Sequence, residues 1–202
     1  CLSRGLGDVY KRQELVLLHR KLQKTTIYVT HDQVEAMTIG EKIAVMDRGV
    51  LQQIGTPEEI YNHPRNRFVA EFIGSPPINI LEAKIVESQG LLRAEIDNYF
   101  IDVPSELQIA LRRMKSSTIL LGVRPENITF YRGKKLNSLS AEVELTESIG
   151  SDLYVYFVNG DRTIIARTHP FNHVTIGEMA WLVFDEKNIH FFDKESGNSL
   201  LP

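Results

Sequence analysis

The chain has 202 residues, of which 43% are hydrophobic, so it can bury a core in one large domain or in two small ones. Its 23 basic and 26 acidic residues give a net charge of −3, which disfavours a nucleic-acid partner. A single cysteine excludes a disulfide framework and a cysteine metal cluster, and no apolar stretch approaches the roughly 20 residues that cross a bilayer.

Residues 1–13 read CLSRGLGDVYKRQ and differ in texture from the rest of the chain. They show neither a hydrophobic period nor a signal-peptide core, and they resemble the in-frame translation of a sequencing adapter. We interpret residues 1–13 as foreign sequence and expect native sequence from about Glu14. The alternative is an unusual native N-terminal arm.

Residues 14–24 predict a helix, because Leu15, Leu18 and Leu22 fall on one helical face. Residues 25–30 are β-branched and aromatic without alternation, which predicts a strand buried on both faces of a parallel sheet. His31 and Asp32 come directly after this strand, at the end where open α/β sheets bind ligands. Asp32 is expected to cap a short helix over residues 33–39.

A hairpin is predicted from strands at residues 42–46 and 50–54. Thr56 and Glu59 have the spacing of a capping box, with Pro57 at the first helical position, and Pro64 ends this helix. A second short helix carries Phe68, Val69, Phe72 and Ile73. The sequence Gly-Ser-Pro-Pro at residues 74–77 predicts a linker and a domain boundary.

Short β-type runs dominate after residue 77, and they predict a small barrel or sandwich. Asn159-Gly160 is a strong hairpin signal between two of these runs. A helix is expected at Ser105–Met114, and residues 194–202 are expected to be a frayed tail. Strands are predicted at residues 80–87, 91–96, 118–123, 141–147, 153–158, 163–167, 180–184 and 189–192.

Four blocks in fixed order, at residues 28–38, 43–49, 53–61 and 68–76, resemble the end of the ATPase domain in ABC-type carbohydrate importers of the maltose and glycerol-3-phosphate type. Residues 121–127 (LGVRPEN) resemble the signature of that family's TOBE domain. The resemblance implies an α/β fragment, the C-terminal end of a P-loop NTPase (ABC ATPase) domain, at residues 14–76. A mostly-β, oligonucleotide-binding-like TOBE barrel would come next at residues 77–193, and a tail at 194–202.

The resemblance also implies roles for single residues. His31 matches the switch histidine, a catalytic residue that faces the γ-phosphate of ATP; whether it acts as acid, base or positioner stays open. Asp32 is expected to cap a helix and Glu35 to support the fold of the segment. Arg124, Pro125 and Glu126 are markers of the TOBE domain, and Arg124 and Glu126 are placed to form an ion pair. The other histidines show no metal-ligand spacing, so no metal site is predicted in this chain.

The 202 residues contain no G-x-x-x-x-G-K-[ST] phosphate loop. The family uses ATP and Mg²⁺, so the residues that bind most of the nucleotide are expected ahead of Glu14, and the chain alone is expected to be inactive. The strand at residues 25–30 would then expose an edge and an apolar face. The part after residue 77 is expected to be the better-folded half.

The resemblance implies an ATPase subunit that pairs with a second copy of itself and with transmembrane permease subunits. It would lie in the cytoplasm, on the inner face of the membrane, and a signalling protein is a further candidate partner. A carbohydrate is the expected cargo. The alternative from another functional class is a stand-alone β-barrel module that regulates or binds an oxyanion such as molybdate. An oligonucleotide is disfavoured by the net charge.

Overall fold

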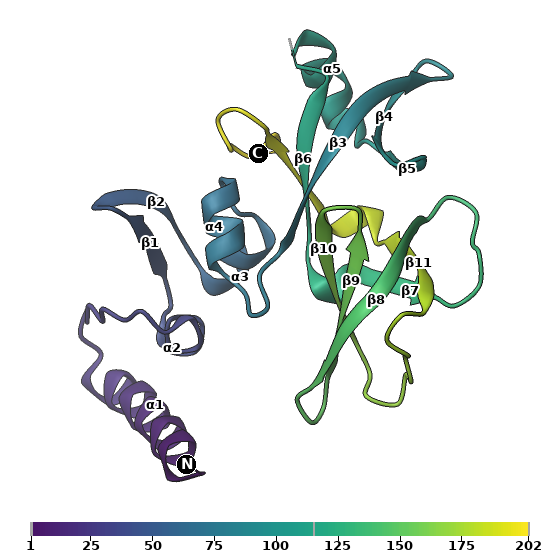
Figure 1. Cartoon of the computed structure of the whole chain (residues 1–202). Coiled ribbons are helices and arrows are strands. Elements are labelled where there is room, and N and C mark those ends of the chain that lie inside the picture. The colour runs from purple at the N-terminus through teal and green to yellow at the C-terminus, as the bar shows by residue number, and fades with distance from the viewer. Residues whose placement is uncertain (1, 115, 202) are drawn as a thin grey trace. The chain divides into compact units, whose positions relative to one another are not determined.

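The computed structural model describes the backbone of residues 2–114 and 116–201, and the side chains of these residues except 2–9, 11 and 12. The chain divides into two compact units, Cys1–Arg65 and Asn66–Pro202 (Figure 1). In the described part of the chain, no helix has both the length and the apolar character needed to cross a bilayer.

The first unit contains a two-stranded antiparallel hairpin that confirms the predicted one. Arg48 and Gly49 form its turn with φ values of 46° and 82°. Two consecutive left-handed residues suit the twist of a tight hairpin, and glycine adopts this conformation at little cost. The elements of this unit are α1 (Leu2–Leu22), α2 (Gln33–Ile39), β1 (Ile43–Asp47), β2 (Val50–Gly55) and α3 (Pro57–Asn62).

The strand predicted at residues 25–30 is wrong, since this segment has no regular structure. An extended backbone becomes a strand only when a neighbour takes up its N–H and C=O groups, and β1 pairs only with β2. The predicted exposed strand edge is therefore wrong as well. The predicted uncovered apolar face is present, because Ile27 and Val29 are 89% and 90% exposed.

The helix ends in this unit agree closely with the sequence signals. Asp32 caps α2 as predicted, and Thr56 and Glu59 form the predicted capping box at the start of α3. The Thr56 N–H donates to the Glu59 carboxylate at 2.8 Å, and this bond lowers the pKa of Glu59. The predicted helix at residues 14–24 is confirmed for residues 14–22, which lie in α1, and residues 23 and 24 follow the end of that helix at Leu22.

The second unit consists of two five-stranded antiparallel sheets that share one core. The β3 sheet has the order β12-β6-β3-β4-β5, and the β8 sheet has the order β10-β9-β8-β11-β7. The elements are α4 (Arg67–Phe72), β3 (Asn79–Ser88), β4 (Leu91–Ile96), β5 (Tyr99–Asp102), α5 (Ser105–Arg113), β6 (Thr118–Val123), η1 (Pro125–Asn127), β7 (Ile128–Tyr131), β8 (Leu139–Ser148), β9 (Leu153–Asn159), β10 (Arg162–Thr168), β11 (Met179–Phe184), η2 (Glu186–Asn188) and β12 (Ile189–Asp193).

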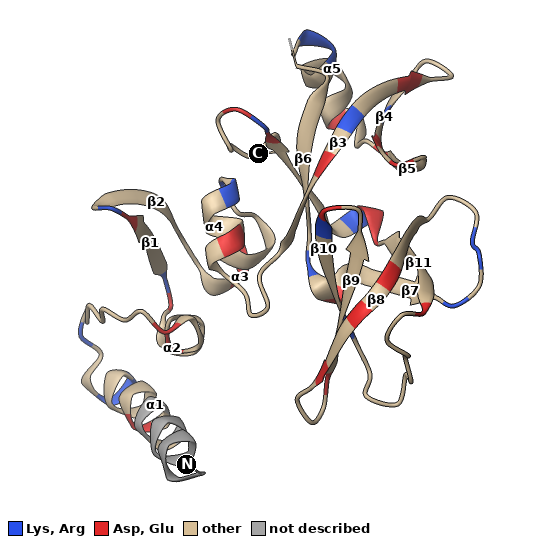
Figure 2. Ribbon diagram, viewed as in Figure 1, with Lys and Arg blue, Asp and Glu red and all other residues tan. Residues whose placement is uncertain are grey.

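All eight strands predicted in this unit are present, and so is the predicted helix, as α5. The sequence missed β5 and β7, which have four residues each and offer too short a pattern to read. The last strand, β12, pairs with β6 and so returns to the sheet that began with β3. Basic and acidic residues are interspersed along the ribbon of the second unit (Figure 2).

Helix α4 belongs to the second unit, so the predicted boundary at residues 74–77 lies inside that unit. Ala70 packs with Ile78, Leu120 and Phe192 in one buried cluster. The Arg124 side chain donates to carbonyl groups at the end of the same helix. These contacts attach α4 to the β3 sheet although the Gly-Ser-Pro-Pro sequence separates them along the chain.

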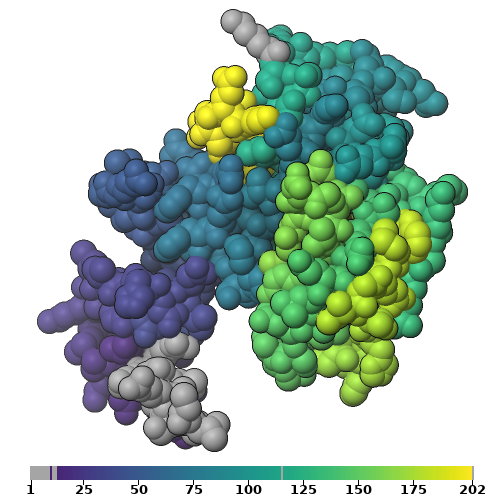
Figure 3. Space-filling model, in the orientation of Figure 1, coloured from purple at the N-terminus to yellow at the C-terminus, as the bar shows by residue number. Residues whose placement is uncertain are grey.

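The predicted frayed tail is wrong for residues 194–201, because backbone hydrogen bonds hold this segment. Leu200 N–H donates to Phe191 O at 2.8 Å, and Arg67 N–H donates to Gly197 O at 2.7 Å. Leu200 and Leu201 also pack against the core. In the space-filling view, the last residues lie against the early part of the same unit (Figure 3). Most residues of this segment are polar, but Leu200 and Leu201 attach it to the core of the second unit.

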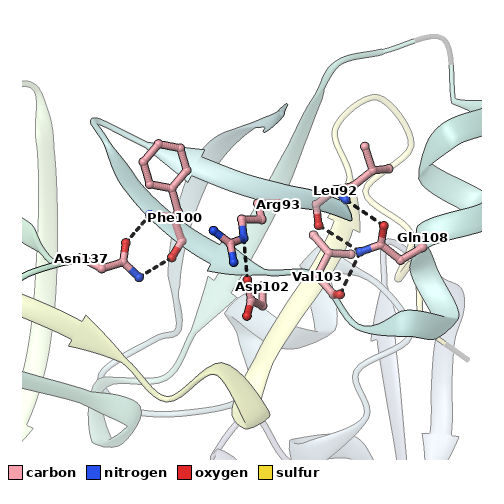
Figure 4. Close-up of polar contacts among 7 residues, drawn as sticks. All are labelled: Leu92, Arg93, Phe100, Asp102, Val103, Gln108 and Asn137. Atoms are coloured by element: carbon pink, nitrogen blue, oxygen red, sulfur yellow. Dashed lines mark hydrogen bonds and ion pairs between the residues drawn. The ribbon is translucent and has the colours of Figure 1, made fainter. Parts of the chain in front are cut away.

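Side-chain amides complete several strands of this unit by pairing with one backbone residue each. The Gln108 side chain accepts from Leu92 N–H and donates to Leu92 O, both at 2.9 Å (Figure 4). The Asn137 side chain makes the same pair of bonds to Phe100, both at 2.8 Å. Each amide thus pairs with the backbone N–H and C=O groups of one strand residue, Leu92 or Phe100.

Candidate functional site

Three hydrogen bonds link the residues that flank His31 in the chain to one another and to Glu35. Thr30 Oγ1 accepts from the Asp32 N–H at 3.0 Å and donates to Glu35 Oε2 at 2.6 Å. Asp32 Oδ1 accepts from the Glu35 N–H at 3.2 Å, which closes the circuit. Thr30, Asp32 and Glu35 are therefore bonded to one another, and His31 lies between Thr30 and Asp32 in the chain.

Glu35 accepts a second hydroxyl in the same place. The Tyr28 hydroxyl donates to Glu35 Oε2 at 3.1 Å, so one carboxylate oxygen holds side chains from two positions before His31. Asp32 Oδ1 also accepts from the Val34 N–H at 2.7 Å and caps α2. A carboxylate suits this position because it can accept several hydrogen bonds and has none to donate.

The side chain of His31 is exposed on the bend that this circuit holds. An exposed imidazole on a fixed backbone can donate a hydrogen bond to an anionic group, or accept one from water. Among the described residues, no group of three or more His, Cys, Asp or Glu is placed to hold a metal ion.

Arg124, Pro125 and Glu126 lie in the second unit, whereas His31 lies in the first. Arg124 is 2% exposed, and its Nη1 donates to the carbonyl groups of Ala70 and Ile73 at the end of α4. A cation at a helix C-terminus also suits the helix dipole. Pro125 is buried and begins η1, whereas Glu126 is exposed. Arg124 thus joins α4 to the β3 sheet.

Two buried polar residues escaped the sequence analysis. Asn79 lies between Ile78 and Ile80 in the sequence. A polar residue inside an apolar run is a pattern that could have indicated a buried amide. Tyr99 is 1% exposed, its hydroxyl accepts from the Phe184 N–H at 2.9 Å, and burial raises its pKa to about 12. Both residues connect the two sheets and are structural.

Comparison with known protein families matches two models. The MalK OB fold domain matches residues 74–128, and the TOBE domain matches residues 121–192. The two matches overlap at residues 121–128, which include the end of β6 and the whole of η1. The expectation of a TOBE domain is thereby confirmed, and an OB fold domain precedes it.

Similar curated proteins carry names of import ATP-binding proteins. The chain is 42% identical over 201 residues to the trehalose/maltose import ATP-binding protein MalK of Thermococcus litoralis, which covers 95% of this chain and 53% of that protein. It is 37% identical over 200 residues to the sn-glycerol-3-phosphate import ATP-binding protein UgpC of Psychromonas ingrahamii, covering 95% and 50%. The oligosaccharides import ATP-binding protein MsmX of Bacillus subtilis is 37% identical over 194 residues, covering 93% and 52%.

The chain therefore spans about half the length of the curated relatives that it matches. One solved structure, the cytoplasmic molybdate-binding protein ModG with molybdate bound, is 14% identical with a TM-score of 0.46. The aligned region covers 56% of this chain and 94% of the ModG chain. That likeness supports no statement about a ligand of this chain.

Proposed function

We propose that this chain, which carries a MalK OB fold domain and a TOBE domain and whose homologues are ATP-binding subunits of sugar importers, is part of an ATP-hydrolysing subunit of an ABC importer for a carbohydrate. The observation that carries the proposal is the identity of 37–42% with the three named relatives, over 93–95% of this chain. In this proposal, residues 14–76 are the end of the nucleotide-binding domain, and residues 77–193 are the regulatory domain.

In the proposed subunit, His31 lies beside the terminal phosphoryl group of ATP. An imidazole N–H can donate to a phosphoryl oxygen and stabilise the charge that develops during transfer. The exposed position of His31 on a fixed bend suits this role. Mg²⁺ neutralises phosphate charge when it is bound, but the described residues offer no cluster for it, so none of them is assigned to the ion.

The proposed assembly contains a second copy of the subunit and transmembrane permease subunits. ATP would close the two copies together, and the movement would pass to the permeases. The subunit would then lie on the cytoplasmic face of the membrane through these partners. A signalling protein that binds the regulatory domain is a further proposed partner.

A chimaera tests the proposal directly. The first half of the Thermococcus litoralis relative would be joined to residues 14–202 of this chain, and ATP hydrolysis would be measured. We expect hydrolysis, and we expect His31→Ala to lower kcat by about 100-fold or more. His63→Ala, at an exposed histidine that caps α3, is the matched control and should change kcat by less than about twofold. Equal activity of the His31 and His63 variants would contradict the proposed role.

The 202-residue chain by itself should bind ATP negligibly, because the sequence contains no phosphate loop. Calorimetric titration with ATP in the presence of Mg²⁺ should give no heat of binding up to about millimolar concentration. Micromolar affinity would contradict the proposed division of the binding site. Titration with molybdate under the same conditions tests the oxyanion-binding alternative.

A further inference from the structure

Glu35 occupies a position from which it can control His31 without touching a nucleotide. Its Oε2 is the common acceptor for the hydroxyls of Tyr28 and Thr30, both of which precede His31 in the chain. Its N–H donates to Oδ1 of Asp32, the residue directly after His31. Glu35 therefore contacts both sides of the histidine by three separate bonds.

Thr30 passes this constraint to the peptide on the other side of His31. A hydroxyl has one proton, and Thr30 gives that proton to Glu35 at 2.6 Å. Its oxygen lone pairs then face the Asp32 N–H, which donates to it at 3.0 Å. Without the carboxylate, the Thr30 side chain loses the bond that holds its rotamer, and a change of that rotamer carries Oγ1 away from the Asp32 N–H.

We propose that Glu35 is the positioning residue of His31: its carboxylate fixes the Thr30 hydroxyl and, through it, the backbone on both sides of the imidazole. The inference rests on the proposed function, because the histidine needs a fixed direction only if it must meet a phosphoryl group. A displacement of about 1 Å at a reacting group can lower a rate by about 100-fold, so a small local change has a large kinetic effect.

Amide hydrogen exchange of the 202-residue chain tests the structural part. In Glu35→Ala, the Asp32 N–H should exchange at least about tenfold faster than in the parent chain, because one charge-assisted bond that orders its acceptor is lost. Thr30→Val should have the same effect, since valine keeps the shape of threonine and lacks the hydroxyl. Glu41→Ala, at an exposed carboxylate near the segment, is the matched control and should leave this rate unchanged. An unchanged Asp32 rate in Glu35→Ala would overturn the inference.

Kinetics of the chimaera test the functional part. Glu35→Ala should lower kcat by about 10- to 100-fold and change KM for ATP by less than about threefold. Glu35→Gln should recover most of kcat, because the amide oxygen can still accept both hydroxyls. The double variant Glu35→Ala/His31→Ala should be no slower than His31→Ala alone, since a positioning residue has no effect once its target is gone.

The outcomes separate this inference from the function it rests on. If His31→Ala has no effect on kcat, the proposed function fails. The exchange rate of the Asp32 N–H still decides whether Glu35 orders the backbone beside His31. If His31→Ala lowers kcat as expected but the loss from Glu35→Ala adds to it in full in the double variant, the inference fails and the proposed function stands. Loss of activity in Glu35→Gln equal to that in Glu35→Ala also counts against the inference.

Discussion

The side chain of Asn79 pairs with the backbone of Ile165 as a neighbouring strand would. Asn79 Oδ1 accepts from the Ile165 N–H at 2.7 Å, and Nδ2 donates to Ile165 O at 2.9 Å. The second proton of the amide goes to Val123 O at 2.9 Å. Since Val123 and Asn79 lie in the β3 sheet and Ile165 lies in the β8 sheet, this buried amide joins the two sheets.

Replacing Asn79 by leucine should lower the free energy of unfolding by about 2–4 kcal/mol. The change keeps the branched shape of the side chain, with bulkier methyl groups at its end, but removes the partners of three backbone groups. Each buried group without a partner costs about 1–3 kcal/mol before relaxation. Urea unfolding of the 202-residue chain measures the loss. Asn137→Leu, which removes a similar pair of bonds at an exposed loop, should cost about 1 kcal/mol or less. Equal losses in the two variants would contradict a special role of the buried amide.

Stability at high pH should depend on Tyr99. Burial raises the pKa of Tyr99 to about 12, above the ordinary value of about 10 in an unfolded chain. The contribution of Tyr99 is therefore fully present below about pH 10 and is lost as the pH rises towards 12. Between pH 9 and pH 11, the native chain should lose about 1 kcal/mol more than Tyr99→Phe in urea unfolding. Parallel pH profiles for the two chains would contradict this.

Gly74 should resist substitution because of the Arg124 guanidinium. A Cβ atom at Gly74 would lie 2.7 Å from Arg124 Nη1, and the φ of 127° disfavours any side chain. Gly90, with a φ of 81° and open space around it, is the control for a positive-φ glycine whose Cβ would meet no neighbour. Gly74→Ala should lower the melting temperature more than Gly90→Ala, and equal shifts would show that the guanidinium yields to the new methyl group.

Arg124→Met should free α4 from the β3 sheet. Hydrogen bonds from a charged donor contribute about 1.5–3 kcal/mol each, and Arg124 makes such bonds to the last turn of the helix. Amide exchange at residues 67–73 should accelerate, while exchange in β8 and β9 should change little. Equal acceleration in all of these elements would mean that Arg124 stabilises the whole unit and not the attachment of α4.

Limited proteolysis with chymotrypsin should cut first in residues 23–32. This segment has no regular structure, and Tyr28, its one aromatic residue and therefore its chymotrypsin site, is 48% exposed. Phe171 is the informative competitor, since it is 80% exposed but lies in a loop whose backbone is hydrogen-bonded at Asn172 and Gly177. Mass spectrometry of the first fragments distinguishes the sites. A first cut at Phe171 would show that the second unit opens more readily than the first.

Local sequence patterns predicted much of the fold, because the side chains that cap a helix and the backbone groups that they bind are close in sequence. Asp32 bonds the N–H groups two and three residues ahead, and Thr56 and Glu59 cap one helix from within four residues. The hairpin at Asp47–Val50 needs only its own turn. The family resemblance added His31, and its role stays a prediction that the chimaera tests.

Interactions between distant residues were beyond the reach of sequence patterns. Glu35 was expected to support its segment, but its two hydroxyl partners emerged only with the fold. Arg124 was placed in a turn with Glu126, and its bonds to α4 span more than 50 residues. Residues 194–201 were expected to fray because their partners, Arg67 and Phe191, gave no sign of them in the sequence.

The sequence by itself determined most strands of the second unit and the helix caps, since apolar periodicity and capping depend on neighbours along the chain. Only the tertiary structure decided that residues 25–30 form no strand, since a strand requires a second one beside it. It also decided which buried polar groups hold the two sheets together. Asn79 must find partners in the interior, and their positions depend on how the whole chain folds.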